Sequence, residues 1–467
     1  MLFATRPRPA RVMPPPGSPA PPTAVRRGRR HSAAAVAAGL VALLPVMAAG
    51  GSAGQPYLQP LLTGGITAGS HGAGGDPGSV LGGVAVLPAR RDGPVAARPP
   101  SAGQQRWLAA GQVPGSTPAQ RATAVRALLD LRLLVRPDGA VAAAWYPGWK
   151  YAWPRDSSWV AAALAATGHG SAALAVLRFI ARVQPPSGVW AARYELTGDG
   201  PVRDGRPDEL DADGWFPWAA WLWYASQPRG AGGRPTAAVT RQLAGLWPAV
   251  RRAAGSTTSL LSDHGLTPSM DYWEDKVSSS SVTLGTAAPL LAGLRAAAGL
   301  ATALGQAADA RRWAAAAAQL GHSIQARFGR TGYQRTPVAS SGADAAVTFL
   351  GPPFAVANAG VRRAVAMTAR RLTLANGGIM PGTAWPGDPG EAWTPETGFF
   401  ALYDAASGDR AAATRWLSWL AGHRTAYGSL PEQVNPAGQP ASVAPLAWTD
   451  AIVLLAMTAG QRPLPVP

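Results

Sequence analysis

The feature that most constrains the fold is a repeated pair of helical segments joined at a glycine. Gly168, Gly305 and Gly408 each follow one helical stretch and precede another. Counted from each glycine, positions +5, +8, +9 and +12 are apolar: Ala173, Val176, Leu177 and Ile180; Ala310, Trp313, Ala314 and Ala317; Ala413, Trp416, Leu417 and Leu420. This i, i+3, i+4, i+7 spacing is typical of a helix that buries one face. A glycine at such a boundary ends one helix and lets the chain turn back.

Repeated antiparallel helix pairs either stack as an open solenoid or close into a ring. Long loops rich in Trp and acidic residues separate the pairs here, at 184–214, 266–281 and 428–445. Irregular pairs with such loops fit a closed ring that carries a site at one mouth better than a solenoid. Since strand signals are few, we predict an all-α ring of helix pairs.

The first fifty residues carry the features of an export signal. A basic run at 26–30 precedes the uncharged stretch 33–50, which ends in small residues. This order is that of a signal peptide, and the apolar stretch is also barely long enough for an uncleaved membrane anchor. We therefore expect a secreted or cell-surface protein, with cleavage left open.

The remaining chain divides by composition. Residues 51–115 are rich in Gly, Pro and Ala without a sustained period, so we expect a linker or an irregular wrap. A helix-start signal at 116–118 opens the expected catalytic domain, 116–460, and a short tail follows at 461–467.

The net charge of +17 does not indicate nucleic-acid binding. Seven arginines lie in the first fifty residues without an acidic residue among them, so +10 remains on the rest of the chain. Those charges are scattered rather than gathered on one stripe. Cysteine is absent, which excludes disulfides, a thiol nucleophile and thiolate metal ligands. We expect no nucleic-acid partner, no cofactor and no metal.

The segment 145–156 crowds aromatic residues around Arg155 and Asp156. A pyranose stacks its C–H face on an indole such as Trp153, while its hydroxyls need donors and acceptors. A buried ion pair that caps a helix explains the same residues equally well.

The segment 206–215 places four acids within six positions. It lacks the calcium-binding EF-hand pattern, because Leu222 stands where the closing glutamate belongs. The alternative is a solvated turn with an aspartate cap. A loop that lines the site is favoured, since Trp215 flanks the acids and Asp213 lies beside it.

Two glutamates on separate loops are the candidate acids. Glu274 follows Tyr272 and Trp273, where desolvation is expected to raise its pKa as a general acid requires, or it is an acid of a first helical turn. Glu432 follows Pro431, which stiffens the loop, or it is an ordinary acidic residue of a loop. Together they matter, because glycoside hydrolysis needs two carboxyl groups that face one bond.

In this order the motifs resemble the family-15 glycoside hydrolases, which comprise glucoamylases, glucodextranases and some bacterial trehalases. The motifs are Trp-x-Arg-Asp at 153–156, an Asp-x-x-Gly-Trp-like element at 211–215, Trp-Glu at 273–274, Gly-x-Leu-Pro-Glu-Gln at 428–433 and Pro-Leu-Ala-Trp-Thr at 445–449. The resemblance covers roughly residues 120–460. It implies an (α/α)6 toroid, in agreement with the helix pairs, and an exo-acting pocket for an α-glucan or oligosaccharide.

The resemblance also implies roles for individual residues. Arg155 and Asp156 would hold the terminal glucose. Glu274 would protonate the glycosidic oxygen and Glu432 would activate water on the opposite face, with carboxyl groups about 6.5–9.5 Å apart as inversion requires. The other residues implied in substrate binding are Trp153, Asp213, Trp215, Trp273 and Trp448.

The chain departs from the family pattern in two places. Residues 51–103 are too short for the N-terminal β-sandwich that bacterial glucoamylases often carry, and the loop 378–386 lacks the Arg-Tyr pair that the family places before the fifth helix pair. Specificity for α-1,4, α-1,6 or α,α-1,1 bonds therefore stays open, with Trp385 and Glu391 as further pocket candidates. A glycan-binding protein that kept the barrel and a polysaccharide lyase are the competing hypotheses.

Overall fold

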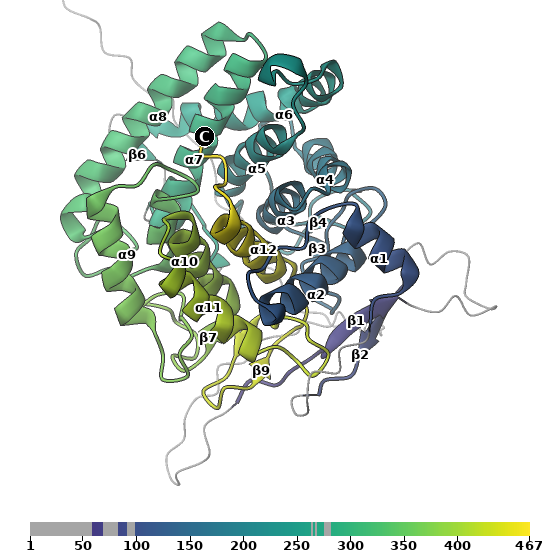
Figure 1. Ribbon diagram of the computed structural model, residues 1–467. Helices are drawn as coiled ribbons and strands as arrows, with labels where there is room; N and C mark the ends of the chain where they lie inside the picture. The colour runs from purple at the N-terminus through teal and green to yellow at the C-terminus, as the bar shows by residue number, and fades with distance from the viewer. Residues whose placement is uncertain (1–57, 69–82, 91–98, 263–264, 267–268, 275–281) are drawn as a thin grey trace, which may run out of the picture. The chain divides into compact units, whose positions relative to one another are not determined.

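The computed structural model describes residues 58–68, 83–90, 99–262, 265–266, 269–274 and 282–467 (Figure 1). The chain divides into residues 1–56 and a compact unit, Tyr57–Pro467. The signal peptide or anchor predicted at 1–50 lies outside the described residues.

The compact unit is built mainly of helices. Their bounds are α1 Ala102–Ala109, α2 Pro118–Leu134, α3 Pro154–Ala166, α4 Gly170–Val183, α5 Ala212–Ser226, η1 Ala231–Gly233, α6 Ala237–Leu260, α7 Leu284–Ala303, α8 Ala307–Arg327, η3 Gly329–Thr331, η4 Ala345–Leu350, α9 Ala359–Leu372, α10 Thr394–Ala406, α11 Arg410–Gly422 and α12 Ala447–Gln461. The short strands are β1 Gly65–Ala68, β2 Val84–Leu87, β3 Tyr151–Ala152, β4 Tyr194–Glu195, β5 Leu261–Ser262, β6 Gly265–Leu266, β7 Ala392–Trp393, β8 Gln433–Val434 and β9 Pro440–Ala441.

The helices form two concentric rings. In the inner ring α3, α5, α7, the 3-10 turn η4, α10 and α12 pack each against the next, and α12 closes the ring on α3 (Figure 1). The outer helices α4, α6, α8, α9 and α11 pack on α3, α5, α7, η4 and α10, while α2 packs on α12. This confirms the predicted all-α (α/α)6 toroid, in which one inner position is filled by a short 3-10 turn.

The glycine turns between paired helices are as predicted. Gly168, Gly305 and Gly408 lie between α3 and α4, α7 and α8, and α10 and α11, with φ of +83°, +71° and +86°. This left-handed conformation costs glycine little, whereas a side chain would be strained there.

The predicted buried stripes hold for two of the three helices. The four apolar positions of α4 and of α11 are buried. In α8, however, Ala314 is exposed, and the buried residues are Trp313, Ala316, Ala317, Leu320 and Ile324. The stripe is therefore shifted in α8, because the face that meets α7, not the distance from the glycine, decides which residues are buried.

Aromatic side chains fill the centre of the inner ring. Trp159 of α3 is fully buried, and its ring contacts Trp215, Trp218, Phe349, Phe354, Phe399 and Trp448, with centroids 5.0–6.3 Å apart. α7 is long and apolar enough to cross a membrane, but 83% of the apolar window is buried in the fold. An inner helix packs on several sides, which explains its apolar composition.

The compact unit begins well before residue 116, the expected start of the catalytic domain. β1 and β2 pair as an antiparallel hairpin, and Leu61 forms a parallel bridge with Ser442. Part of the segment 51–115, expected to be a linker or an irregular wrap, therefore belongs to the compact unit, because its backbone pairs with a loop of the barrel more than 300 residues later in the chain.

Candidate active site

The candidate residues gather at one mouth of the ring. The inner helices alternate with outer ones, so their N-termini lie at the same end of the toroid. Arg155 is in the first turn of α3, Asp211 directly precedes α5, and Glu274 and Glu432 lie on the loops that lead to α7 and α12. The sequence order of loop and inner helix thus brings four distant segments together.

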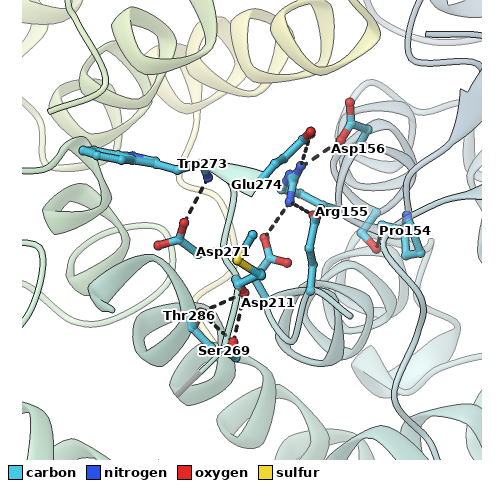
Figure 2. A network of polar contacts seen from close by, with 12 residues as sticks. Pro154, Arg155, Asp156, Asp211, Ser269, Asp271, Trp273, Glu274 and Thr286 are labelled. Atoms are coloured by element: carbon cyan, nitrogen blue, oxygen red, sulfur yellow. Dashed lines mark hydrogen bonds and ion pairs between the residues drawn. The ribbon is translucent and has the colours of Figure 1, made fainter. Parts of the chain in front are cut away.

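Arg155 lies at the centre of this group (Figure 2). Its Nη1 is 2.5 Å from Oε2 of Glu209 and 3.2 Å from Oδ2 of Asp211, and its Nη2 is 3.4 Å from Oε1 of Glu274. Nε lies 3.7 Å from Oδ2 of Asp156. With 3% of its surface exposed, Arg155 is almost fully desolvated and is held by several carboxyl groups at once.

The carboxyl groups around Arg155 are themselves buried. Burial raises the pKa of Asp156 to about 7 and that of Asp211 to about 6, although the nearby guanidinium acts in the opposite direction. The pKa of Glu209 is raised well above its ordinary value, first by burial. Protons can therefore bind within this group near neutral pH, which is common at catalytic sites.

Glu274 is held by a second cation. Nη1 of Arg206, from the loop before α5, donates to its Oε2, and 28% of the Glu274 side chain is exposed. The backbone of Glu274 has φ +57°, and its N–H donates to the carbonyl of Asp271 over 2.8 Å. A positive φ in a non-glycine residue costs of the order of 1 kcal/mol, so the surroundings must hold it.

Trp273 does not form the environment of Glu274, contrary to the prediction. The two side chains point to opposite sides of their loop (Figure 2), and only 1% of Trp273 is exposed. The Trp273 ring lies 3.3 Å from the guanidinium carbon of Arg335 and packs edge-on against Trp385. Consecutive residues in this turn face different ways, so the apolar setting inferred from sequence adjacency is replaced by two guanidinium groups.

A network of buried ion pairs holds the loop that carries Glu274. Nη2 of Arg335 lies 3.0 Å from Oδ1 of Asp271, which also accepts the backbone N–H of Trp273 over 2.9 Å. Nη1 of Arg335 lies 2.6 Å from Asp344. Because both acids are fully buried, removing the arginine would leave two uncompensated carboxylates.

Glu432 accepts a hydrogen bond at each carboxyl oxygen. Nε1–H of Trp149 donates to Oε1 over 3.1 Å, and the hydroxyl of Ser442 donates to Oε2. Burial raises the pKa of Glu432, the two hydrogen bonds lower it, and the negative charge of Glu274 raises it. The two glutamates are thus close enough to interact electrostatically across the mouth of the ring.

Trp448 and Trp153, both predicted to bind substrate, each lie against an arginine. The guanidinium of Arg155 is 5.1 Å from the ring centroid of Trp448, which forms the floor beneath it. Trp153 packs against Tyr151 and lies 5.0 Å from the guanidinium of Arg193. Both indoles are largely buried at the border between the aromatic core and the polar group.

Asp213 and Trp215 are not part of the group. Trp215 is buried in the aromatic core against Trp159, and Asp213 is buried in the first turn of α5. Both residues lie inside α5, whereas Glu209 and Asp211, which contact Arg155, precede that helix.

The acidic segment binds the guanidinium group of Arg155. Glu209 and Asp211, just before α5, both bind Arg155, whereas the sequence pointed to Asp213 as the substrate-binding acid of this segment. In the described part of the chain no group of three or more His, Cys, Asp or Glu residues is placed to hold a metal ion.

Several residues of the site are not among those predicted from the sequence. Trp149 was part of the aromatic segment, and Glu209, Asp211 and Arg206 belonged to the acidic one, so a signal existed for each. Ser442 had none, because only tertiary pairing brings it to Glu432.

Glu396 is a further deep carboxyl group. It lies in the first turn of α10 with 3% of its surface exposed, and burial together with the charges of Asp344 and Glu432 raises its pKa to about 8. With this pKa the carboxyl group is mainly protonated at neutral pH.

The loop 378–386, which lacks the family's Arg-Tyr pair, closes over Trp273. A Cβ on Gly382 would lie 2.5 Å from Cζ2 of that ring, so only glycine allows this approach. Trp385 of the same loop packs between Trp273 and Trp393, while Glu391 is buried.

No family model matches the chain. It is similar to an uncharacterized glycosyl hydrolase of Methanocaldococcus jannaschii, with 25% identity over 205 residues, which is 44% of this chain and only 30% of that protein. Among solved structures, a glycosidase variant in complex with glucose has a TM-score of 0.61 and 19% identity, over 78% of this chain and 100% of that one. The glucoamylase from Saccharomycopsis fibuligera has a TM-score of 0.60 and 14% identity, over 80% and 96%. The chain therefore has the fold of the glucoamylases.

Proposed function

We propose that the protein is an exo-acting, inverting glycoside hydrolase that releases terminal α-linked glucose from an oligo- or polysaccharide. The observation that carries the proposal is the pair Glu274 and Glu432, which lie on separate loops at one mouth of the ring and interact electrostatically. Two carboxyl groups that face one bond are the minimum that this chemistry needs.

The two glutamates take different roles. Glu274, which is partly exposed, donates its proton to the glycosidic oxygen as the bond to the sugar breaks. Glu432 removes a proton from a water molecule that attacks the opposite face of the sugar ring. The hydrogen bonds from Trp149 and Ser442 orient Glu432 for that water.

Arg155 and Asp156 hold the terminal glucose by its hydroxyls, and Trp153 and Trp448 provide apolar surface beside it. The glucose bound in the glycosidase of the same fold and the likeness to a glucoamylase support this substrate. A basic, then apolar, N-terminal stretch supports export, so we place the protein outside the cell or at its surface.

The test is a product assay with maltose, isomaltose, trehalose and dextran, which separates the glucoamylase, trehalase and glucodextranase specificities. Proton NMR should show β-glucose as the first product. Glu274→Gln and Glu432→Gln should abolish turnover with an unchanged fold, whereas the exposed Glu195→Gln is the matched control. Release of the α-anomer first would contradict inversion, and binding on a glycan array without released sugar would favour a glycan-binding protein.

A further inference from the structure

Residues 58–64, which we call the strap, lie against the loop that carries Ser442. The backbone N–H of Ser442 donates to the carbonyl of Pro60 over 2.9 Å, and the N–H of Leu62 donates to the carbonyl of Ser442 over 2.6 Å. The strap leads into β1, which Figure 1 shows in purple at the N-terminal end of the described chain. Residue 442 is thus paired on both of its backbone groups by a segment that precedes the whole barrel.

Thr63 extends this pairing with its side chain. Its hydroxyl donates to the carbonyl of Ala444 over 2.8 Å and accepts the N–H of the same residue over 2.9 Å. Thr63 is buried, so both backbone groups of Ala444 depend on this one hydroxyl instead of on water. On the barrel side, the hydroxyl of Thr425 donates to the carbonyl of Gly64 over 2.5 Å and fixes the end of the strap.

Glu432 lies on the other side of the same loop. Its N–H donates to the carbonyl of Val443 over 2.8 Å, and β8, which follows it, pairs with β9. The stretch 440–444 is therefore held between the strap and the segment that begins at Glu432. The packing of this stretch between the two segments brings the hydroxyl of Ser442 to the carboxyl group of Glu432.

The backbone of Ser442 makes this support necessary. Its φ is +62°, a conformation that non-glycine residues rarely adopt, and the residue is fully buried. Such a conformation is strained in a residue with a side chain and persists only where the surroundings determine it. The strap supplies a large part of those surroundings, because it binds both the N–H and the carbonyl of Ser442.

We propose that the strap is part of the catalytic apparatus, and that Thr63 is a positioning residue that acts through Ser442 to orient Glu432. The inference rests on the proposed function, in which Glu432 is the base. Glu432 is then correctly oriented only when this segment N-terminal to the barrel has docked, so a part of the chain whose sequence predicts a linker or an irregular wrap contributes to turnover.

The test compares Thr63→Val, which keeps the shape and removes the hydroxyl, with Thr63→Ser, which retains it. Thr63→Val should lower kcat about tenfold with little change in KM, since the loss of a buried hydrogen bond corresponds to roughly that factor. The acidic limb of the pH profile should move to higher pH, because the Ser442 hydroxyl lowers the pKa of Glu432. Thr63→Ser should restore both, and Thr67→Val in β1 is the matched control.

Two further measurements keep the outcome decisive. In the double variant Thr63→Val with Ser442→Ala, kcat should equal that of Ser442→Ala alone, because both act on one interaction. If Thr63→Val does not fold, Thr425→Val, which frees the strap from the barrel side, should move the acidic limb in the same direction.

A lower melting temperature with wild-type kcat and pH profile in Thr63→Val would overturn the inference and leave the proposed function intact. A wild-type protein without turnover would instead contradict the proposed function. In that case the pKa of Glu432, measured by carboxyl NMR in wild-type and Thr63→Val protein, still decides: an unchanged pKa refutes the strap's role.

Discussion

The indole N–H of Trp149 donates to Oε1 of Glu432 over 3.1 Å, while Ser442 binds the other oxygen of the same carboxyl group. Each of these hydrogen bonds favours the charged form of Glu432, against the burial and the charge of Glu274 that favour the neutral form. The protonation state of Glu432, the proposed base, therefore depends on these neighbours. Removing one of them should shift the pKa of Glu432 in the direction opposite to that neighbour's contribution.

Trp149→Phe should move the acidic limb of kcat/KM to higher pH. An aromatic ring is kept, but the N–H that lowers the pKa of Glu432 is lost, so the base is protonated at a higher pH than in the wild type. A displacement of up to about one pH unit corresponds to about 1.4 kcal/mol. The pH–rate profile measures it, with Trp247→Phe on α6 as the control, and an unmoved or lowered limb would contradict the role of Trp149.

Arg155→Met should destabilise the protein strongly at pH 7 and less at pH 5. The substitution leaves buried carboxyl groups without their cation, which costs about 3–5 kcal/mol for a buried ion pair. The pKa values of about 7 for Asp156 and about 6 for Asp211 mean that these acids are mostly neutral at pH 5, where the missing charge matters less.

Urea unfolding at the two pH values measures this difference. Arg251→Met is the control, since Arg251 forms an exposed ion pair with Asp309 and its loss should change the free energy of unfolding by less than about 1 kcal/mol. An equal loss of stability at pH 5 and pH 7 for Arg155→Met would show that the buried acids do not titrate as described.

Glu396→Gln should make the stability of the protein less dependent on pH. Burial raises the pKa of Glu396 to about 8, above its unfolded value, so its favourable contribution is present at low pH and is lost as the pH rises toward 8. Between about pH 5 and 8 the wild type should lose up to about 1.4 kcal/mol per pH unit from this group. The slope of unfolding free energy against pH should decrease in Glu396→Gln, whereas an unchanged slope would refute the raised pKa.

The ring of helices was predictable because its signals are local. A glycine such as Gly168 with a positive φ and a stripe of apolar residues at helical spacing are both set within a few turns of one helix. The stripe fails in α8, where Ala314 is exposed and Ala310 only half-buried, because there the neighbouring helix, not the local sequence, decides which face is buried.

The site was predictable only in part, for two physical reasons. Neighbours in sequence can point in opposite directions, so Trp273 next to Glu274 did not reveal what that glutamate contacts (Figure 2). In the acidic segment, Glu209 and Asp211 contact Arg155 while Asp213 lies inside α5, and only the fold decides which of these neighbouring acids meets the distant arginine. Ser442 could not be found at all, because its position depends on pairing with the distant Pro60 and Leu62.

Trp159 connects the core to the site, and its truncation should affect both. The fully buried indole packs against a cluster of aromatic rings that includes Trp448, which in turn lies 5.1 Å beneath the guanidinium of Arg155. Trp159→Ala removes the centre of that cluster and should lower the free energy of unfolding by about 3–5 kcal/mol, the range for large-to-small changes of a buried aromatic residue.

The effect on the site follows from the space that Trp159→Ala creates. Trp448 can shift into that space, so Arg155 loses the ring on which its guanidinium lies, and KM should rise for the variant that still folds. Trp159→Phe should cost less stability and keep KM near the wild-type value. Calorimetry and steady-state kinetics on both variants measure the two effects. A loss of stability without any change in KM would show that the aromatic core only supports the fold, and that Arg155 is held by its carboxyl partners alone.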